Sequence, residues 1–101
     1  MKAVQHIKCI NNSWFVLSFE LEGRDHQALC SGDLPIQRAW VLELPEDGFP
    51  EGSEVTLRVR AAMGQECLAT ERLDLAPNGR TAVFEVTGTS LDFSVRMIAI
   101  N

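Results

Sequence analysis

The fold is decided by two stretches of alternating sequence, Phe15-Val16-Leu17-Ser18-Phe19-Glu20-Leu21-Glu22 and Val55-Thr56-Leu57-Arg58-Val59-Arg60-Ala61. Successive side chains of a β-strand point to opposite faces, so alternation of apolar and polar residues gives one buried face and one solvated face. The same rhythm recurs along the chain and is interrupted by clusters of Gly, Pro, Asn and Asp. This pattern is typical of strands that pack in a sandwich.

Seven strands can be read from the pattern, at residues 3–10, 14–22, 37–44, 54–63, 66–76, 81–87 and 91–100. They predict an all-β fold, an antiparallel two-sheet sandwich of the immunoglobulin-like class, in a single domain over residues 1–101. Asn78-Gly79 predicts a tight hairpin between the two strands that flank it. Two stretches stay open: residues 24–33 read as a short strand or a helical turn, and residues 66–76 also fit an amphipathic helix.

The charge balance limits the classes of partner. The 101 residues carry a formal net charge of -5 at pH 7, which argues against nucleic acid and against anionic membrane surfaces. No apolar stretch is long enough for a membrane span. The first residues lack the apolar core of a signal peptide, so with Met1 as the natural start we expect a cytoplasmic protein. A chain that had lost its leader would instead be secreted.

The three cysteines, Cys9, Cys30 and Cys67, are an odd number for a closed disulfide framework. We expect reduced thiols, with one bridge plus a free thiol as the alternative. Asn11-Asn12-Ser13 is a glycosylation sequon that matters only in a secreted protein.

Reactive chemistry has little support in the sequence. His6 and Cys9 are an odd number of positions apart, which places them on opposite faces of a strand. His26 and Cys30, four apart, form the one local pair that a metal site or a Cys–His nucleophile could use. We therefore predict no catalytic residue, no metal and no cofactor.

Several apolar residues lie out of phase with the buried face of their predicted strand. A strand that is apolar on both faces needs a cover over the outer one, unless a β-bulge restores the phase. Arg58 and Arg60 share the solvated face of their strand, where they either pair with carboxylates across strands or bind a partner. The candidate interface residues are Val4, Trp14, Val16, Arg58, Arg60, Ile98 and Ile100.

Four segments carry a resemblance to a known family: residues 11–14 (Asn-Asn-Ser-Trp), 44–46 (Leu-Pro-Glu), 55–61, and 88–91 (Gly-Thr-Ser-Leu). They resemble a family of small single-domain immunoglobulin-like sandwiches known from insulin-pathway-regulated nematode proteins and from bacteria. The resemblance implies no catalytic residues. Cys9, Trp40 and Cys67 imitate the Cys–Trp–Cys order of antibody-type domains, a spacing compatible with a bridge between sheets.

The sequence thus predicts a non-catalytic binding or interaction module that associates with itself, or with a protein partner, through an apolar outer strand face. The alternative is a carbohydrate or small-ligand binder that uses Trp14 or Trp40 as a stacking platform. A weaker alternative is a metal-binding protein or a Cys/His enzyme built on His26 and Cys30.

Overall fold

The computed structural model describes residues 2–23, 28–43, 52–61, 65–89 and 91–101, and these form two packed β-sheets without a helix. The nine described strands are β1 (Lys2–Val4), β2 (His6–Asn11), β3 (Leu17–Gly23), β4 (Ala28–Cys30), β5 (Ala39–Glu43), β6 (Glu54–Ala61), β7 (Glu66–Leu75), β8 (Thr81–Thr89) and β9 (Asp92–Ile100). The predicted all-β class and the two-sheet arrangement are confirmed. Within the described ranges, no helix has the length and apolar character needed to cross a membrane.

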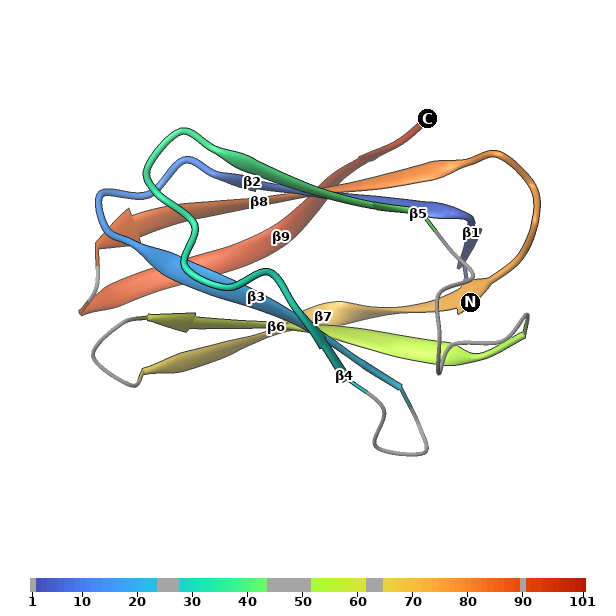
Figure 1. The fold of residues 1–101 in the computed structure, drawn as a ribbon, viewed down its shortest axis with the longest axis horizontal. Coiled ribbons are helices and arrows are strands. Elements are labelled where there is room, and N and C mark those ends of the chain that lie inside the picture. The colour runs from blue at the N-terminus through green and yellow to red at the C-terminus, as the bar shows by residue number, and fades with distance from the viewer. Residues whose placement is uncertain (1, 24–27, 44–51, 62–64, 90) are drawn as a thin grey trace.

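One sheet has the strand order β1-β7-β6-β3-β4, and the other has the order β5-β2-β8-β9 (Figure 1). The stretch at 66–76 that also fitted a helix is the ten-residue strand β7, and the open stretch at 24–33 contains the short strand β4. Nine strands replace the seven predicted ones because β4 is added and the first predicted strand is two strands.

The prediction of a purely antiparallel sandwich is wrong at two places. β1 pairs with β7 in parallel, and β2 pairs with β8 in parallel, while the other pairings are antiparallel. The hairpin predicted at Asn78-Gly79 is wrong for the same reason, since β7 and β8 belong to different sheets. The Asn-Gly segment makes a turn, but the turn carries the chain from one sheet to the other.

Gln5 divides the first predicted strand, because the chain changes sheets there as well. The amides of Gln5 and His6 both donate to the Arg80 carbonyl at 2.9 Å. Asn78 Nδ2 donates to the Ala3 carbonyl at 2.9 Å, and the Gly79 amide donates to Gln5 Oε1 at 2.8 Å. Two crossings far apart in sequence therefore lie side by side, and the strands before and after them run parallel.

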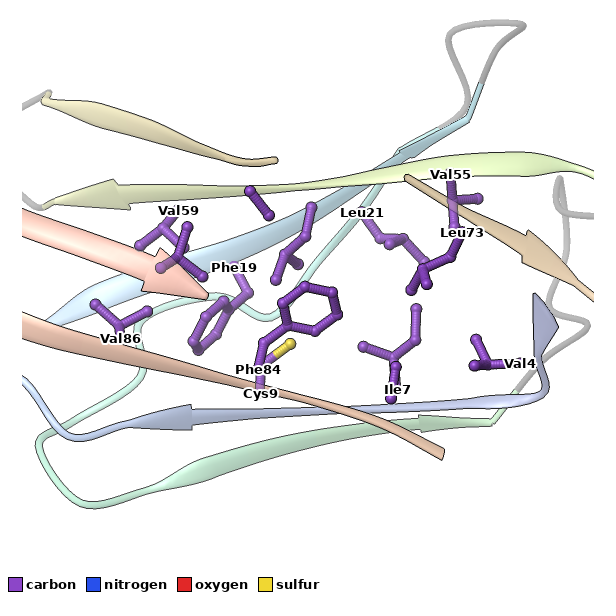
Figure 2. Packing of buried hydrophobic residues seen from close by; sticks show 14 of the residues in the cluster. Val4, Ile7, Cys9, Phe19, Leu21, Val55, Val59, Leu73, Phe84 and Val86 are labelled. Carbon is purple, nitrogen blue, oxygen red and sulfur yellow. The ribbon is translucent and has the colours of Figure 1, made fainter. Parts of the chain in front are cut away.

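The core lies between the sheets and is apolar throughout (Figure 2). The two alternating stretches behave as predicted: every second residue of β3, and of β6 from Val55 to Ala61, is buried. Phe19 from one sheet stacks on Trp40 from the other, with ring centroids 6.3 Å apart and planes inclined by 15°. Burial of such a continuous apolar layer is the main source of stability in a sandwich.

Candidate binding surface at one end of the sandwich

Three connections meet at one end of the sandwich, at the left of Figure 1: residues 12–16, residues 34–38 and the turn that leads into β9. They carry four large apolar side chains that are open to solvent. The exposed fractions are 79% for Trp14, 76% for Leu91, and 41% for both Val16 and Ile36. We call these four residues the apolar tip. A cluster of exposed apolar side chains on loops is a common mark of a contact surface.

The connection that carries Trp14 is fixed to the β8–β9 hairpin. The Asn12 amide donates to the Val86 carbonyl at 3.0 Å, and the Trp14 amide donates to the Gly88 carbonyl at 3.1 Å. Beneath the tip, the rings of Phe15 and Phe93 pack with centroids 5.0 Å apart and planes inclined by 54°. The exposed side chains thus stand on an ordered base.

A buried amide ties this connection to the segment that carries Ile36. Asn11 Nδ2 donates to the carbonyls of Phe15 at 3.0 Å, Leu34 at 3.0 Å and Pro35 at 3.2 Å. Asn11 Oδ1 accepts from the Ser13 amide at 3.0 Å and from the Ser13 hydroxyl. Asn11 has no exposed surface, so the folded chain does not present its sequon for glycosylation.

Among the predicted interface residues, Val4 was placed wrongly. It is fully buried at one end of the core, with Val86 and Val59 toward the other end (Figure 2). The change of sheet at Gln5 resets the phase between β1 and β2. Val4 and Ile7 therefore both point into the core, although their odd spacing in one continuous strand would have put them on opposite faces.

Ile98 and Ile100 are separated by a β-bulge, which the sequence left open. Val83 pairs with Ala99 and Phe84 pairs with Met97, so Ile98 is the extra residue. Its side chain is 46% exposed. Beyond the bulge the phase is restored and Ile100 packs against the core, so its predicted place on the outer face is wrong.

Arg58 and Arg60 take the cross-strand alternative and pair with carboxylates of neighbouring strands. Arg58 lies within 3.5 Å of Glu20, 3.1 Å of Glu22 and 3.8 Å of Glu66 (N···O distances), and Arg60 lies 2.6 Å from Glu66. Glu20 directly faces Arg58 across the β3–β6 ladder. Arg58 is therefore surrounded by carboxylates of its own sheet.

The sulfur and imidazole groups are spread over the fold. Cys9 is buried, Cys67 is half-buried and Cys30 is exposed, and all three thiols are free. Burial raises the pKa of the Cys9 thiol, which disfavours the reactive thiolate. Residue His26 lies outside the described residues. The residues that are described contain no group of three His, Cys, Asp or Glu side chains that could hold a metal ion.

The sequence identified half of the apolar tip. Trp14 and Val16 were found through their phase within a predicted strand, but β3 begins at Leu17 and both residues lie in the preceding connection. Ile36 was missed, and its signal was an apolar residue next to Pro35 in an irregular stretch. Leu91 was placed in the predicted strand at 91–100, which is wrong, because it lies in the turn before β9 and is exposed.

Solved structures of other proteins have a fold similar to that of this chain. No family model matches the chain, and no curated protein matches it. Among solved structures, the membrane-binding domain of pneumolysin is similar with a TM-score of 0.56 and 17% identity, over 94% of this chain and 96% of that domain. Listeriolysin O is similar with a TM-score of 0.60 and 12% identity, over 96% of this chain and 22% of the toxin.

A non-hemolytic pneumolysin from Streptococcus pneumoniae strain ST306 is similar with a TM-score of 0.55 and 15% identity, over 94% of this chain and 23% of the toxin. The chain therefore spans less than a quarter of the whole toxins, and nearly all of the isolated membrane-binding domain. At these identities the likeness establishes the fold alone.

Proposed function

We propose that this protein is a non-catalytic binding module whose contact surface is the apolar tip. The observation that carries the proposal is the concentration of exposed apolar side chains. Of the seven large hydrophobic residues exposed in the described part of the chain, four stand on connections at one end. Single exposed hydrophobic residues are ordinary, whereas a group on one end of a rigid scaffold marks a contact surface.

The proposed target is the surface of an uncharged lipid bilayer. An exposed Trp suits the boundary between headgroups and acyl chains, where its apolar ring and its N–H group are both satisfied. The net charge of -5 opposes binding to anionic lipid, so the apolar contribution has to carry the affinity. The likeness to a domain described as the membrane-binding domain of pneumolysin supports the same target class.

The size of the effect follows from the exposed area. A Trp side chain buries roughly 150–250 Å², and at about 25 cal/mol per Å² full transfer is worth about 4–6 kcal/mol. Transfer of about half of that area, as at an interface, leaves about 2–3 kcal/mol. Replacing Trp14 by Ala should therefore weaken partitioning by roughly 30- to 150-fold.

Co-sedimentation with phosphatidylcholine vesicles tests the proposal. We expect the protein to sediment with the vesicles, and Trp14→Ala and Leu91→Ala to abolish most of that binding. Val41→Ala is the matched control, because Val41 is 60% exposed on β5, away from the tip. Failure of the unmodified protein to sediment, or equal binding by the tip variants and the control, would refute the lipid target.

The carbohydrate alternative uses the same exposed ring. Trp40 is not an open platform, because it is half-buried and stacked on Phe19. Trp14 is exposed enough to stack on a sugar. A glycan array therefore separates the two targets: glycan binding that Trp14→Ala removes, together with no binding to pure phosphatidylcholine, assigns the tip to carbohydrate.

Self-association has one specific observation in its favour. Among the described strands, β9 ends the sheet that contains it and has a strand partner on one side only. Beside it lies a groove of about 400 Å³ that is lined by Ala3, Arg80 and residues 97–100. An edge strand of this kind can pair with a second copy. Sedimentation velocity tests this candidate: a concentration-dependent dimer that Ile98→Glu abolishes supports it, and a monomer at all concentrations removes it.

A further inference from the structure

Asn11 occupies a position that the fold alone does not require. It is the last residue of β2, and its side chain is fully buried beneath the apolar tip. Its amide reaches backbone groups of two separate connections, at Phe15 and at Leu34 and Pro35. We propose that Asn11 is a positioning residue, which holds the connections carrying Trp14 and Ile36 in one fixed arrangement.

The chemistry of the site selects an amide. Three backbone carbonyl oxygens face Asn11 Nδ2 and need a donor, whereas the amide and hydroxyl of Ser13 face Oδ1 and need an acceptor. Asn and Gln carry an NH2 group with two hydrogens beside a carbonyl oxygen, whereas a hydroxyl has a single hydrogen to donate, and Asn has the shorter reach. An aspartate would place negative charge against three carbonyl oxygens, and an apolar residue would leave buried polar groups without partners.

Backbone hydrogen bonds also join the segment at 34–38 to the residues that flank the Trp14 connection. Leu34 exchanges two of them with Leu17. The Gln37 amide donates to the Asn11 carbonyl at 2.7 Å, and the Asn11 amide donates to the Arg38 carbonyl at 2.9 Å. The Asn11 side chain adds three bonds to these and is the only described side chain that bonds to both connections. Its removal should loosen the Trp14 connection, which then keeps its backbone bonds to Val86 and Gly88, while the two sheets stay folded.

A fixed tip has a direct consequence for binding. A contact surface that is already ordered loses less conformational entropy when it binds, so its binding affinity is higher. This consequence rests on the proposed function, whereas the positioning itself does not. We expect Asn11→Ala to weaken vesicle binding about 5- to 10-fold without removing any exposed apolar side chain.

The test measures the local motion of Trp14 in the absence of any ligand. The chain has two tryptophans, so Trp40→Phe leaves Trp14 as the single indole. In this background, time-resolved anisotropy reports how freely the Trp14 ring moves. We expect Asn11→Ala to increase the amplitude of the fast decay at least twofold, and Ser13→Ala, which removes one bond to Oδ1, to give a smaller increase.

Leu73→Ala is the matched control for a loss of stability. Leu73 is buried and pairs with Val55 at the start of β6, whereas the end of β6 at Ala61 pairs with Leu17 beside the tip. This variant should be destabilised yet keep the slow Trp14 decay and the vesicle affinity, corrected for the folded fraction.

The outcomes separate the two proposals. An unchanged Trp14 decay in folded Asn11→Ala overturns the positioning role, and so does an equal increase in Leu73→Ala. If Asn11→Ala does not fold, Ser13→Ala decides on the same readout. A faster Trp14 decay in a protein that binds no vesicles supports the positioning role and refutes the lipid target.

Discussion

Gly88 should be the most sensitive of the described glycines that have a positive φ, which are Gly32, Gly52, Gly79 and Gly88. It lies in β8 with a φ of +116°, and a methyl group there would lie 2.4 Å from the Asp92 carbonyl oxygen and 2.8 Å from Phe93 Cα. Both neighbours are backbone atoms, so the β8–β9 hairpin has to shift. The strained φ costs about 1–3 kcal/mol and the overpacking about 1–3 kcal/mol. We therefore expect Gly88→Ala to lower the free energy of unfolding by about 2–6 kcal/mol.

Urea denaturation followed by circular dichroism measures this loss. With a slope of about 1.5 kcal/mol per M, a loss of 3 kcal/mol lowers the midpoint by about 2 M. Gly79→Ala is the matched control, since Gly79 has a φ of +72° but nothing within 4 Å of an added methyl group. It should cost only the backbone strain, about 1–2 kcal/mol. Equal losses in the two variants would show that the close approach at Gly88 is not a constraint.

Two further predictions concern the outer face of the sheet that contains β6. Replacing Arg58 by Gln leaves Glu20, Glu22 and Glu66 facing one another and should cost about 1–2 kcal/mol, less in 1 M NaCl. Arg60→Gln should cost less than Arg58→Gln, because Arg60 is exposed and has one carboxylate partner. Chemical denaturation of both variants checks this order. Burial, and then the Glu20 carboxylate that accepts from Cys30 Sγ at 3.4 Å, raise the pKa of the Cys30 thiol. Glu20→Gln should lower that pKa and so increase the rate at which maleimide labels Cys30 at pH 8, while Cys9 stays unlabelled until the protein unfolds; an unchanged rate would contradict the assigned cause.

The periodicity of the sequence correctly predicted the features that depend on neighbouring residues of one strand. The alternation in β3 and β6 follows from the pleat of a strand with one buried face. It therefore correctly located the core residues of these two strands, such as Phe19 in β3 and Val59 in β6. The hydrophobic phase also showed that Ile98 and Ile100 needed a bulge or a cover, and the bulge is present.

Sheet assignment could not be predicted in the same way. A turn at Asn78-Gly79 and a break at Gln5 have the same local signature whether the next strand pairs with the previous one or crosses to the other sheet. The choice is made by hydrogen bonds between residues about 75 positions apart, such as Asn78 to Ala3. For that reason the parallel pairs were missed, and Val4 was placed on the wrong face. The immunoglobulin-like class and the family resemblance stay predictions.

The tip was only partly predictable because its residues come from three separate connections. Trp14 stood out as an apolar residue out of phase, whereas nothing in the sequence around Ile36 or Leu91 indicates that they share an end of the molecule with it. The sequence showed Asn11 only as part of a glycosylation sequon, because its role in joining two connections depends on tertiary contacts.

The most direct test of the central claim is the fluorescence of Trp14 in the Trp40→Phe variant on phosphatidylcholine vesicles. If the apolar tip is the contact surface, Trp14 emission shifts to shorter wavelength when vesicles are added, and lipids brominated on the upper acyl chain quench it. Emission that stays at the wavelength of a solvent-exposed indole, without quenching by brominated lipid, would contradict the account.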